Sequence, residues 1–520
     1  MSREETIRKI KEEPEWDLLV IGGGSSGLGI AVDAASRGLK TLLVEQADFS
    51  KGTSSRSTKL IHGGVRYLAQ GDIKLVLEAL KERGLFLKNA PHLSRKQPFI
   101  IPIYSNWDRI KYLVGLKLYD LMAGKERIGR SQWLSIESTV AELPQVSTKG
   151  LKGGVLYYDG QFDDSRMAIA LAQTCEDHGG SVLNYCRVIR LLKDDKGIVN
   201  GAILEDKETG ETYSVKASIV INATGVFVDE IHEMDTGQEM HTIKPSQGVH
   251  LVLPSKFLGT LKNALMIPET DDGRVLFLVP WHQHLVVGTT DTPIDTHTLE
   301  PRAQENEIDF ILRNAQKYLK SDPHRRDVLS IFAGLRPLAI PGGGEGGATK
   351  KISRRHYIEV SKDRLLTITG GKWTTYRQMA EDTVDKAIRV GNLKAEPCRT
   401  HQLKIHGWAE EASLMENGLN VYGTDRKQID DLVIENPVYA ERLEEDWPQT
   451  RGEVVWAVRK EMARKVEDVL CRRFRILFLD RQAAIKMAPK VAEIMKEELQ
   501  RDEEWMEREL QEFYELAEGY

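Results

Sequence analysis

The sequence predicts an α/β protein in which a Rossmann-like domain encloses an antiparallel β domain and is followed by an all-helical domain. Three observations predict this order: a strand, glycine turn, helix and strand over residues 16–46, short apolar runs separated by turns over residues 244–360, and charged helical periodicity after residue 395. A chain of 520 residues is too long for one hydrophobic core. We therefore expect residues 1–395 to form the first domain, with the β domain interleaved mainly at about 90–160 and 244–360, and residues 396–520 to form the helical domain.

Composition and charge exclude several classes of protein. The net charge of −6 provides no basic field for nucleic acid. The four cysteines have neither disulfide-framework nor metal-ligand spacing, so we expect no structural disulfide and no metal site. No stretch approaches about eighteen uninterrupted apolar residues, and the charged start lacks the apolar core of a signal peptide, so we expect neither export nor a membrane span. Peripheral membrane association stays open.

The first strand and helix are joined by a glycine-rich turn. Gly22, Gly24 and Gly27 match G-x-G-x-x-G, and Glu45 ends the second apolar run roughly twenty residues later. Glycines here let backbone approach a pyrophosphate at a helix N-terminus, and the acid can accept a hydrogen bond from a ribose hydroxyl. A turn without a ligand is the alternative, but the complete strand, helix, strand and acid favour a dinucleotide. An acid rather than a basic group predicts FAD or NAD and not NADP.

The segments that follow favour FAD over NAD. The second apolar run leads not into another strand and helix but into TSSRSTKLIHGGVRYL, residues 53–68, whose hydroxyls, cations and glycine pair suit close backbone approach to a ligand. We expect helices near residues 73–89 and 110–122. An apolar strand later ends at Ala223, Thr224 and Gly225, and another runs into Gly370 and Gly371 before a helix. Both are further turns of the kind that contact a dinucleotide.

Taken together, the glycine motif with Glu45 and the segments RSTKLIHGGVRYL, INATGVF, GTTDTP, GLRPL and ITGGKWTTYR resemble the FAD-dependent glycerol-3-phosphate dehydrogenases, nearest the quinone-linked, mitochondrial type. The resemblance covers most of the chain and implies an FAD-binding domain of the glutathione-reductase/D-amino-acid-oxidase type with non-covalent FAD. No D-x-[DN]-x-[DN]-G loop occurs, so we do not expect the calcium-binding C-terminal extension of those enzymes. The acid-rich start is unlike a mitochondrial leader, so we expect a bacterial enzyme, peripheral on the cytoplasmic side of the inner membrane.

The resemblance implies oxidation of sn-glycerol 3-phosphate to dihydroxyacetone phosphate, with hydride passing from C2 to flavin N5 and electrons passing to ubiquinone or menaquinone in the membrane. A homodimer is compatible with it. Two alternatives stay open: an oxidase that uses oxygen and produces hydrogen peroxide, and a cofactor-binding scaffold without activity. Residues 471–482, CRRFRILFLDRQ, alternate basic and bulky apolar residues and are a candidate for lipid contact, although packing inside the helical domain explains them equally well.

The catalytic candidates are two histidines and an arginine. His62 and His250 match active-site positions of the family, either can remove the proton of the C2 hydroxyl, and we favour His62. Arg336 suits phosphate oxygens through its guanidinium fork. A satisfied core histidine or a solvated ion pair is the plain alternative for each residue taken alone. The residues that the resemblance assigns to substrate are Arg66, Tyr67, Arg336, Arg354 and Lys372.

The resemblance also implies the contacts to FAD. Hydroxyls of the TSSRS stretch are expected near the phosphates or the ring edge, Gly63 lets backbone approach the isoalloxazine, and Lys59 supports the same wall. Lys372 begins a helix whose N-terminus faces the pyrimidine edge of the flavin. The full set of expected cofactor residues is Gly22, Gly24, Gly27, Glu45, Ser54, Ser55, Ser57, Gly63, Ala223, Thr224, Gly225, Gly370, Gly371, Thr374 and Thr375.

Overall fold

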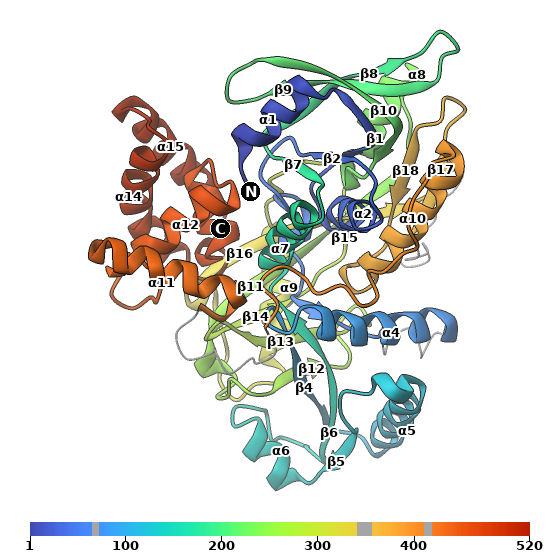
Figure 1. Ribbon diagram of the computed structural model, residues 1–520. Helices are drawn as coiled ribbons and strands as arrows, with labels where there is room; N and C mark the ends of the chain where they lie inside the picture. Colours follow the sequence, from blue (N-terminus) through green and yellow to red (C-terminus); the bar gives the residue numbers. More distant parts are fainter. Residues whose placement is uncertain (65–71, 341–355, 410–418) are drawn as a thin grey trace.

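The computed structural model of the protein describes residues 1–64, 72–340, 356–409 and 419–520. In this part of the chain two large sheets form the body of the molecule, and the C-terminal helices pack along one side of it (Figure 1). Arg66, Tyr67 and Arg354, which the sequence assigns to substrate, lie outside the described residues.

The first sheet is the Rossmann-like sheet that the sequence predicts. Its central strands are parallel, in the order β18 (Leu366–Thr369), β10 (Thr212–Asn222), β1 (Glu15–Ile21), β2 (Thr41–Val44) and β7 (Ser181–Leu183). One face is covered by α2 (Ser25–Ser36), α7 (Asp164–Asp177) and α10 (Tyr376–Gly391), and the other by α1 (Arg3–Glu12), β8 (Cys186–Lys193), β9 (Val199–Asp206) and α8 (Val228–Thr236). Cover on both faces explains the uninterrupted apolar runs at residues 18–21 of β1, 42–44 of β2 and 219–221 of β10.

The second sheet corresponds to the expected β domain but is mixed rather than wholly antiparallel. β12 (Ala264–Ile267) pairs in parallel with β4 (Ser94–Ile103), because the two strands come from distant segments and not from one hairpin. α9 (Glu305–Gln316), which the apolar runs of residues 244–360 do not signal, packs on this sheet. The other strands are β3 (Leu60–Ile61), β5 (Gln132–Leu134), β6 (Gly153–Phe162), β11 (Ile243–Pro254), β13 (Leu276–Trp281), β14 (His284–Gly288), β15 (Thr292–Pro293) and β16 (Ser330–Ala339).

The position of β17 (Tyr357–Val360) corrects the sequence prediction. Its residues belong to the range 244–360 expected in the β domain, but the strand pairs antiparallel with β18 in the first sheet. Only residues 361–365 separate the two strands, and the Ser361 N–H donates to the Leu365 carbonyl at 2.8 Å across the turn. A connection this short makes the two strands hairpin neighbours, so they share one sheet.

Three helices border the second sheet: α4 (Ile73–Asn89), α5 (Asn106–Ala123) and α6 (Ile136–Glu142). α5 begins one turn before its expected start, because the Ser105 hydroxyl accepts the Trp107 N–H at 3.2 Å and caps the helix there. In Figure 1, α5 and α6 lie at the lower end of the molecule, away from the C-terminal helices.

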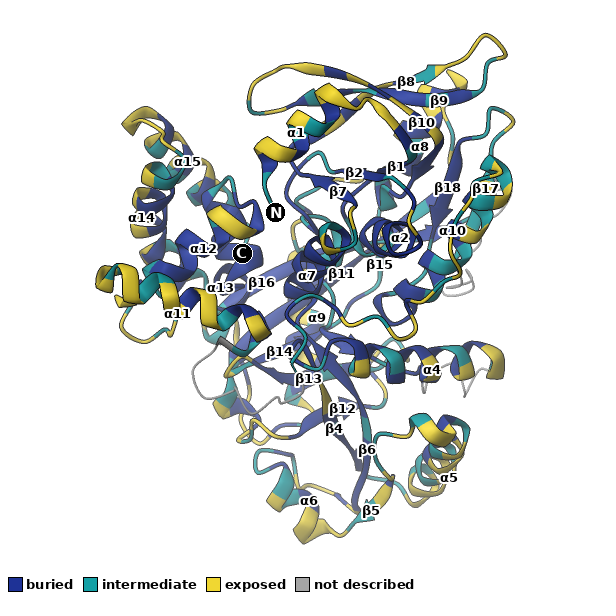
Figure 2. Cartoon of the chain, viewed as in Figure 1, coloured by how far each residue is buried: buried dark blue, intermediate teal, exposed yellow. Residues whose placement is uncertain are grey.

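The C-terminal helices surround an apolar core, visible as dark inner faces in Figure 2, which they share with Val252, Trp281, Val286 and Phe332 of the second sheet. The α-helices are α11 (Arg426–Glu435), α12 (Arg451–Glu461), α13 (Ile476–Leu479), α14 (Arg481–Glu498) and α15 (Glu503–Ala517). The candidate lipid-contact segment 471–482 fills this core, since Phe474 is 2% and Leu477 0% exposed. That segment is therefore an interior packing element and not a lipid contact. The domain boundary expected near residue 395 stays a prediction.

Candidate active site

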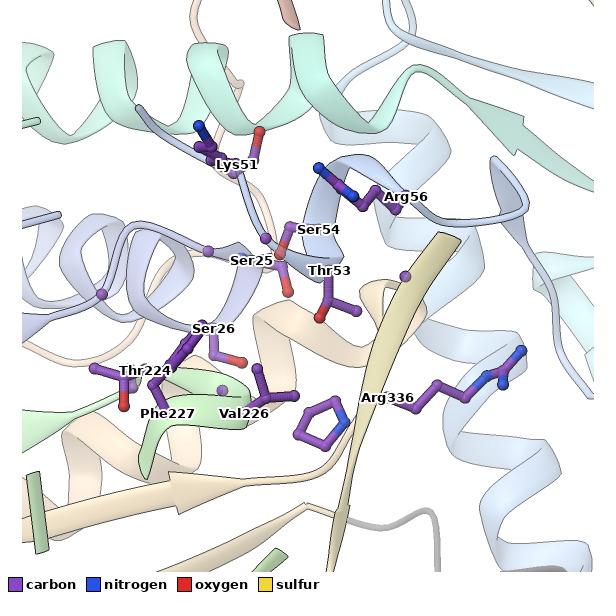
Figure 3. Close-up of a pocket in the computed structure, with 18 of the residues that line it drawn as sticks. Ser25, Ser26, Lys51, Thr53, Ser54, Arg56, Thr224, Val226, Phe227 and Arg336 are labelled. Carbon is purple, nitrogen blue, oxygen red and sulfur yellow. Dashed lines mark hydrogen bonds between the residues drawn. The ribbon is translucent and has the colours of Figure 1, made fainter. Parts of the chain in front are cut away.

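A cavity of about 620 Å³ opens where β1, β2, β10 and β18 end, and it extends to the second sheet. In Figure 3, Thr224 and Phe227 lie on one side of this pocket and Arg336, on β16, lies on the other. The crevice at the carboxyl ends of parallel strands is the usual ligand site of open α/β sheets. The predicted cofactor segments and the predicted substrate residues of the second sheet thus meet in one place.

The glycine turn after β1 is too tightly packed for side chains. Gly22 has φ of +109°, and a Cβ there would lie 2.7 Å from the Ala223 carbonyl oxygen. A Cβ on Gly27 would lie 1.9 Å from the Gly22 oxygen, so the start of α2 could not pack against the turn. Gly24 and Ser25, at the N-terminus of α2, line the cavity. The N–H groups and dipole at that terminus favour an anion.

The Glu45 carboxylate is held at the end of β2 by backbone donors. One oxygen accepts the Gly23 N–H at 2.7 Å and the other accepts the Ala47 N–H at 2.9 Å. Burial raises the pKa of Glu45, while these two N–H groups act in the opposite direction. Each oxygen keeps a second acceptor position, so Glu45 can accept hydrogen bonds from the hydroxyls of a ribose. Ala223, Thr224 and Gly225 also line the cavity.

The three expected serine contacts divide into different roles. Ser54 lines the cavity, and its hydroxyl oxygen accepts the Ser25 N–H at 2.9 Å. Ser55 is fully buried and does not line the cavity, which differs from the expectation. Ser57 borders the cavity, but its hydroxyl donates to Asp164 at 2.7 Å, a partner on α7 that the local sequence does not signal.

Lys59 lies beneath the cavity wall and not at its surface. Its Nζ donates to both oxygens of Asp164, at 2.7 and 2.8 Å, and both residues are fully buried. Burial lowers the pKa of Lys59, and the carboxylate opposes that shift. The rings that surround the ammonium group are Trp281, Phe332 and Phe478. Removal of one partner would leave a buried charge uncompensated, so we assign the pair a structural role.

Packing explains why residue 63 is a glycine. It does not line the cavity, and a Cβ there would meet the Tyr119 hydroxyl at 2.3 Å and the Leu80 side chain at 2.5 Å. Its N–H donates to Asp159, which also accepts from Tyr119 at 2.8 Å. The physical reason for glycine is therefore the contact with α4 and α5 on the side away from the cavity.

The turn after β18 contributes most of its expected residues. Gly370 and Gly371 have φ of +73° and +83°, and both line the cavity together with Lys372 and Thr374. Thr375, the N-cap of α10, is buried and does not line it. The turn therefore presents a lysine and the start of a helix to the cavity.

The two histidines lie in different environments. His62 directly follows β3, is half-buried and lines the cavity. His250, on β11, also lines the cavity but is only 2% exposed, with its ring stacked on Phe332 and its Nε2 2.9 Å from the Thr58 hydroxyl. Burial and then the Arg336 charge lower the pKa of His250 well below its usual value. His250 is therefore neutral at pH 7, and a proton on its ring would be poorly tolerated.

Arg336 presents its guanidinium group at the second-sheet side of the cavity. The side chain is 25% exposed and is oriented by Asp291 at 3.2 Å, by the Thr289 hydroxyl at 3.1 Å and by the Thr290 carbonyl at 3.0 Å. Asp291, Thr289 and Thr290 belong to the GTTDTP segment, so this motif positions the arginine. A guanidinium fixed in this way can receive an anion with little loss of side-chain freedom.

Several residues of the cavity were not predicted. Thr53 and Thr58 line it from the hydroxyl-rich stretch, and Phe227 lines it beyond the Ala-Thr-Gly turn. Cys186, at the start of β8, also lines it, and burial raises the pKa of its thiol to about 12. No sequence signal marks Cys186, because only the fold brings β8 beside β2. A thiol that stays protonated agrees with a cofactor held without a covalent bond.

These residues fit a dinucleotide such as FAD: two glycine turns that a Cβ would obstruct, a helix N-terminus and a carboxylate at the end of the second strand. Fold and site together define an FAD-dependent oxidoreductase. The family model described as "FAD dependent oxidoreductase" matches residues 17–377, and the one described as "C-terminal domain of alpha-glycerophosphate oxidase" matches residues 364–506.

Known relatives show which family of FAD-dependent oxidoreductases the chain resembles. The chain is 41% identical over 543 residues to "Glycerol-3-phosphate dehydrogenase, mitochondrial" of Bos taurus, covering 98% of this chain and 74% of that protein. It is 37% identical over 563 residues to the Schizosaccharomyces pombe protein of the same name, covering 96% and 86%. The solved glycerol-3-phosphate dehydrogenase of Bacillus halodurans, complexed with FAD, superimposes with a TM-score of 0.81 at 30% identity, covering 99% of this chain and 97% of that one. The chain belongs to the glycerol-3-phosphate dehydrogenase family of FAD-dependent oxidoreductases, and FAD is its cofactor.

Proposed function

We propose that the protein oxidises sn-glycerol 3-phosphate to dihydroxyacetone phosphate. The observation that supports this most strongly is the meeting of His62, Arg336 and Lys372 with the glycine turns in one cavity. An alcohol that bears a phosphate needs a base for its hydroxyl proton and cations for its dianion, and this cavity offers both. Membership of the glycerol-3-phosphate dehydrogenase family supports the same substrate.

His62 is the proposed base. It is half-buried at the cavity, so it can take the C2 hydroxyl proton and later release it toward solvent. His250 is neutral and bound to Thr58, and we propose that it orients the substrate hydroxyls. When bound, FAD supplies the two-electron acceptor for the hydride that leaves C2. Loss of the proton from oxygen and of the hydride from carbon leaves the ketone product.

The phosphate end of the substrate is assigned to Arg336 and Lys372. Arg336 is oriented by Asp291 at the cavity, where its positive charge attracts the phosphate dianion. Arg66, Tyr67 and Arg354 lie outside the described residues, and we retain them as proposed substrate contacts on the basis of the sequence resemblance.

The electron acceptor is proposed to be a membrane quinone, ubiquinone or menaquinone, reached from the membrane surface. In the described residues no helix is both long and apolar enough to cross a bilayer. The glycine turns form a single dinucleotide site in the described cavity, which FAD takes in this account, so a soluble nicotinamide acceptor has no equivalent place there. We further propose a peripheral position on the cytoplasmic side of a bacterial inner membrane.

Turnover of the purified holoenzyme with a soluble quinone analogue tests this function. We expect dihydroxyacetone phosphate to form in equal amount to the reduced quinone, with hydrogen peroxide as a minor product. The reason is that a quinone is the proposed acceptor, so oxygen is expected to take only a small share of the electrons. Faster turnover with oxygen than with quinone, and peroxide equal to product, would make the protein an oxidase. The solved L-alpha-glycerophosphate oxidase of Mycoplasma pneumoniae shares the fold, at 18% identity and with a TM-score of 0.56, over 75% of this chain and 98% of that one.

A further inference from the structure

Helix α5 is apolar on two opposite faces. One face packs against the second sheet and α4 through Leu116, Tyr119 and Ala123, which are between 0 and 7% exposed. The opposite face is turned to solvent. Its large apolar side chains are Trp107 at 73% exposure, Ile110 at 57%, Val114 at 63%, Leu118 at 46% and Leu121 at 75%. Helices that are apolar all round are normally buried in a protein or in a lipid phase, so the second face calls for a partner.

The exposed residues form a continuous stripe. At about 100° per residue, positions 107, 110, 114, 118 and 121 fall within a sector roughly 80° wide, along the whole length of the helix. The buried positions 116, 119 and 123 fall on the opposite side of the same projection. A stripe of this kind is an organised surface and differs from apolar side chains scattered singly over a protein.

Basic side chains flank the stripe. In the same projection Lys111 lies on one side of it and Lys117 on the other, and both are exposed. Residues 106–130 contain six lysines and arginines against three acids, whereas the whole chain has 72 basic against 78 acidic residues. Two of the three acids are engaged, since Asp120 accepts the Ser131 N–H and Glu126 pairs with Lys88. The helix and the segment that follows it are therefore basic as well as apolar, on an acidic protein.

A neighbouring helix also exposes apolar side chains. α4 packs beside α5, and near its N-terminus it exposes Ile73 at 55% and Leu77 at 46%. Figure 2 shows the exposed residues of α5 at the lower right of the molecule, on the opposite side from α11, α14 and α15. Trp107 stands at the N-terminal end of the stripe, and tryptophan is enriched at the boundary between headgroups and acyl chains.

We propose that α5 is the membrane-docking helix of this protein. The helix lies in the plane of an anionic bilayer, with its apolar stripe among the acyl chains and Lys111 and Lys117 extended to the headgroups. Charge selects a lipid surface over a second copy of the chain, because a symmetric dimer through this face would bring the same basic residues together. The inference rests on the proposed function for its purpose, access to a membrane quinone, but docking itself requires neither substrate nor quinone.

Vesicle binding of the FAD holoenzyme tests the inference. The double variant V114Q/L121Q removes the two most exposed aliphatic side chains of the stripe without touching the core. Sedimentation with phosphatidylcholine vesicles containing about one third phosphatidylglycerol is expected to show a partition coefficient lowered by about tenfold or more. K111Q/K117Q is expected to lose the preference for these vesicles over pure phosphatidylcholine. I434Q is the matched control, since Ile434 is 78% exposed but lies on α11, outside the stripe of α5.

Three results would overturn the proposal: equal vesicle binding by the wild type and V114Q/L121Q, no binding by the wild type, or conversion of a wild-type dimer to a monomer by V114Q/L121Q in lipid-free sedimentation. The last result would assign the stripe to self-association. Turnover with a soluble quinone is measured on the same samples and is expected to be equal in all of them. If the wild type binds vesicles but shows no turnover with the soluble quinone, the proposed function is wrong and the assignment of α5 as the docking helix is unaffected.

Discussion

Replacement of His62 by alanine is expected to slow anaerobic reduction of the flavin by glycerol 3-phosphate by about 10²- to 10⁴-fold. His62 is the proposed base. Without it, the only histidine left at the described cavity wall is the buried His250, which accepts a proton poorly. Stopped-flow absorbance at saturating substrate measures this step directly. Because the flavin itself is unaltered by the substitution, its bound spectrum is expected to stay that of the wild type.

Two further variants make the His62 result interpretable. His284→Ala is the matched control, because His284 stacks on Trp447 outside the cavity, and it is expected to keep the reduction rate within about twofold. His250→Gln is expected to weaken substrate binding more than it slows the step at saturation. A normal rate in His62→Ala together with a large loss in His250→Gln would transfer the role of base to His250.

Replacement of Arg336 by alanine is expected to lower kcat/KM for glycerol 3-phosphate roughly 30- to 1,000-fold, mainly through a higher KM. This corresponds to a loss of about 2–4 kcal/mol of transition-state stabilisation. The guanidinium is held in place by Asp291 and Thr290, so its removal takes away a charge already aimed at the cavity. Arg336→Lys keeps the charge without the fork and is expected to recover part of the loss. Steady-state kinetics with a soluble quinone gives these values.

The control for Arg336 is Arg313→Ala, since Arg313 is 57% exposed and pairs with Asp271 on the surface. This variant is expected to keep the wild-type kcat/KM. If Arg336→Ala discriminates between glycerol 3-phosphate and glycerol as strongly as the wild type does, the phosphate is bound elsewhere and the assignment fails.

The parts of the fold that local pattern could predict are those built from sequence neighbours. The unit from β1 to β2 was predicted because its glycine turn, helix and two apolar runs are contiguous, and the predicted Rossmann-like sheet is confirmed. The parallel pair of β4 and β12 could not be predicted, because the partners are more than 160 residues apart in the sequence and share no connecting turn. The assignment of β17 to the second sheet was wrong, because the residue pattern predicts that a segment is a strand but not which strand it pairs with.

The same distinction applies to the site. The glycine turns could be predicted, since positions with a positive φ or a close approach of backbone require glycine. The partner of Ser57 and Lys59 could not, because Asp164 is a buried carboxylate from α7 more than a hundred residues away. The close approach of Tyr119 to Gly63 has no local signal in the sequence either, because Tyr119 lies on a distant helix, α5.

Anaerobic titration of the purified holoenzyme with glycerol 3-phosphate shows whether this compound is its substrate. We expect the visible absorption of the bound flavin to bleach on addition of about one equivalent of substrate. Glycerol at the same concentration is expected to leave it unchanged, because glycerol has no phosphate for Arg336 and Lys372 to bind. Bleaching by lactate or by an amino acid, with glycerol 3-phosphate inactive, would contradict this expectation.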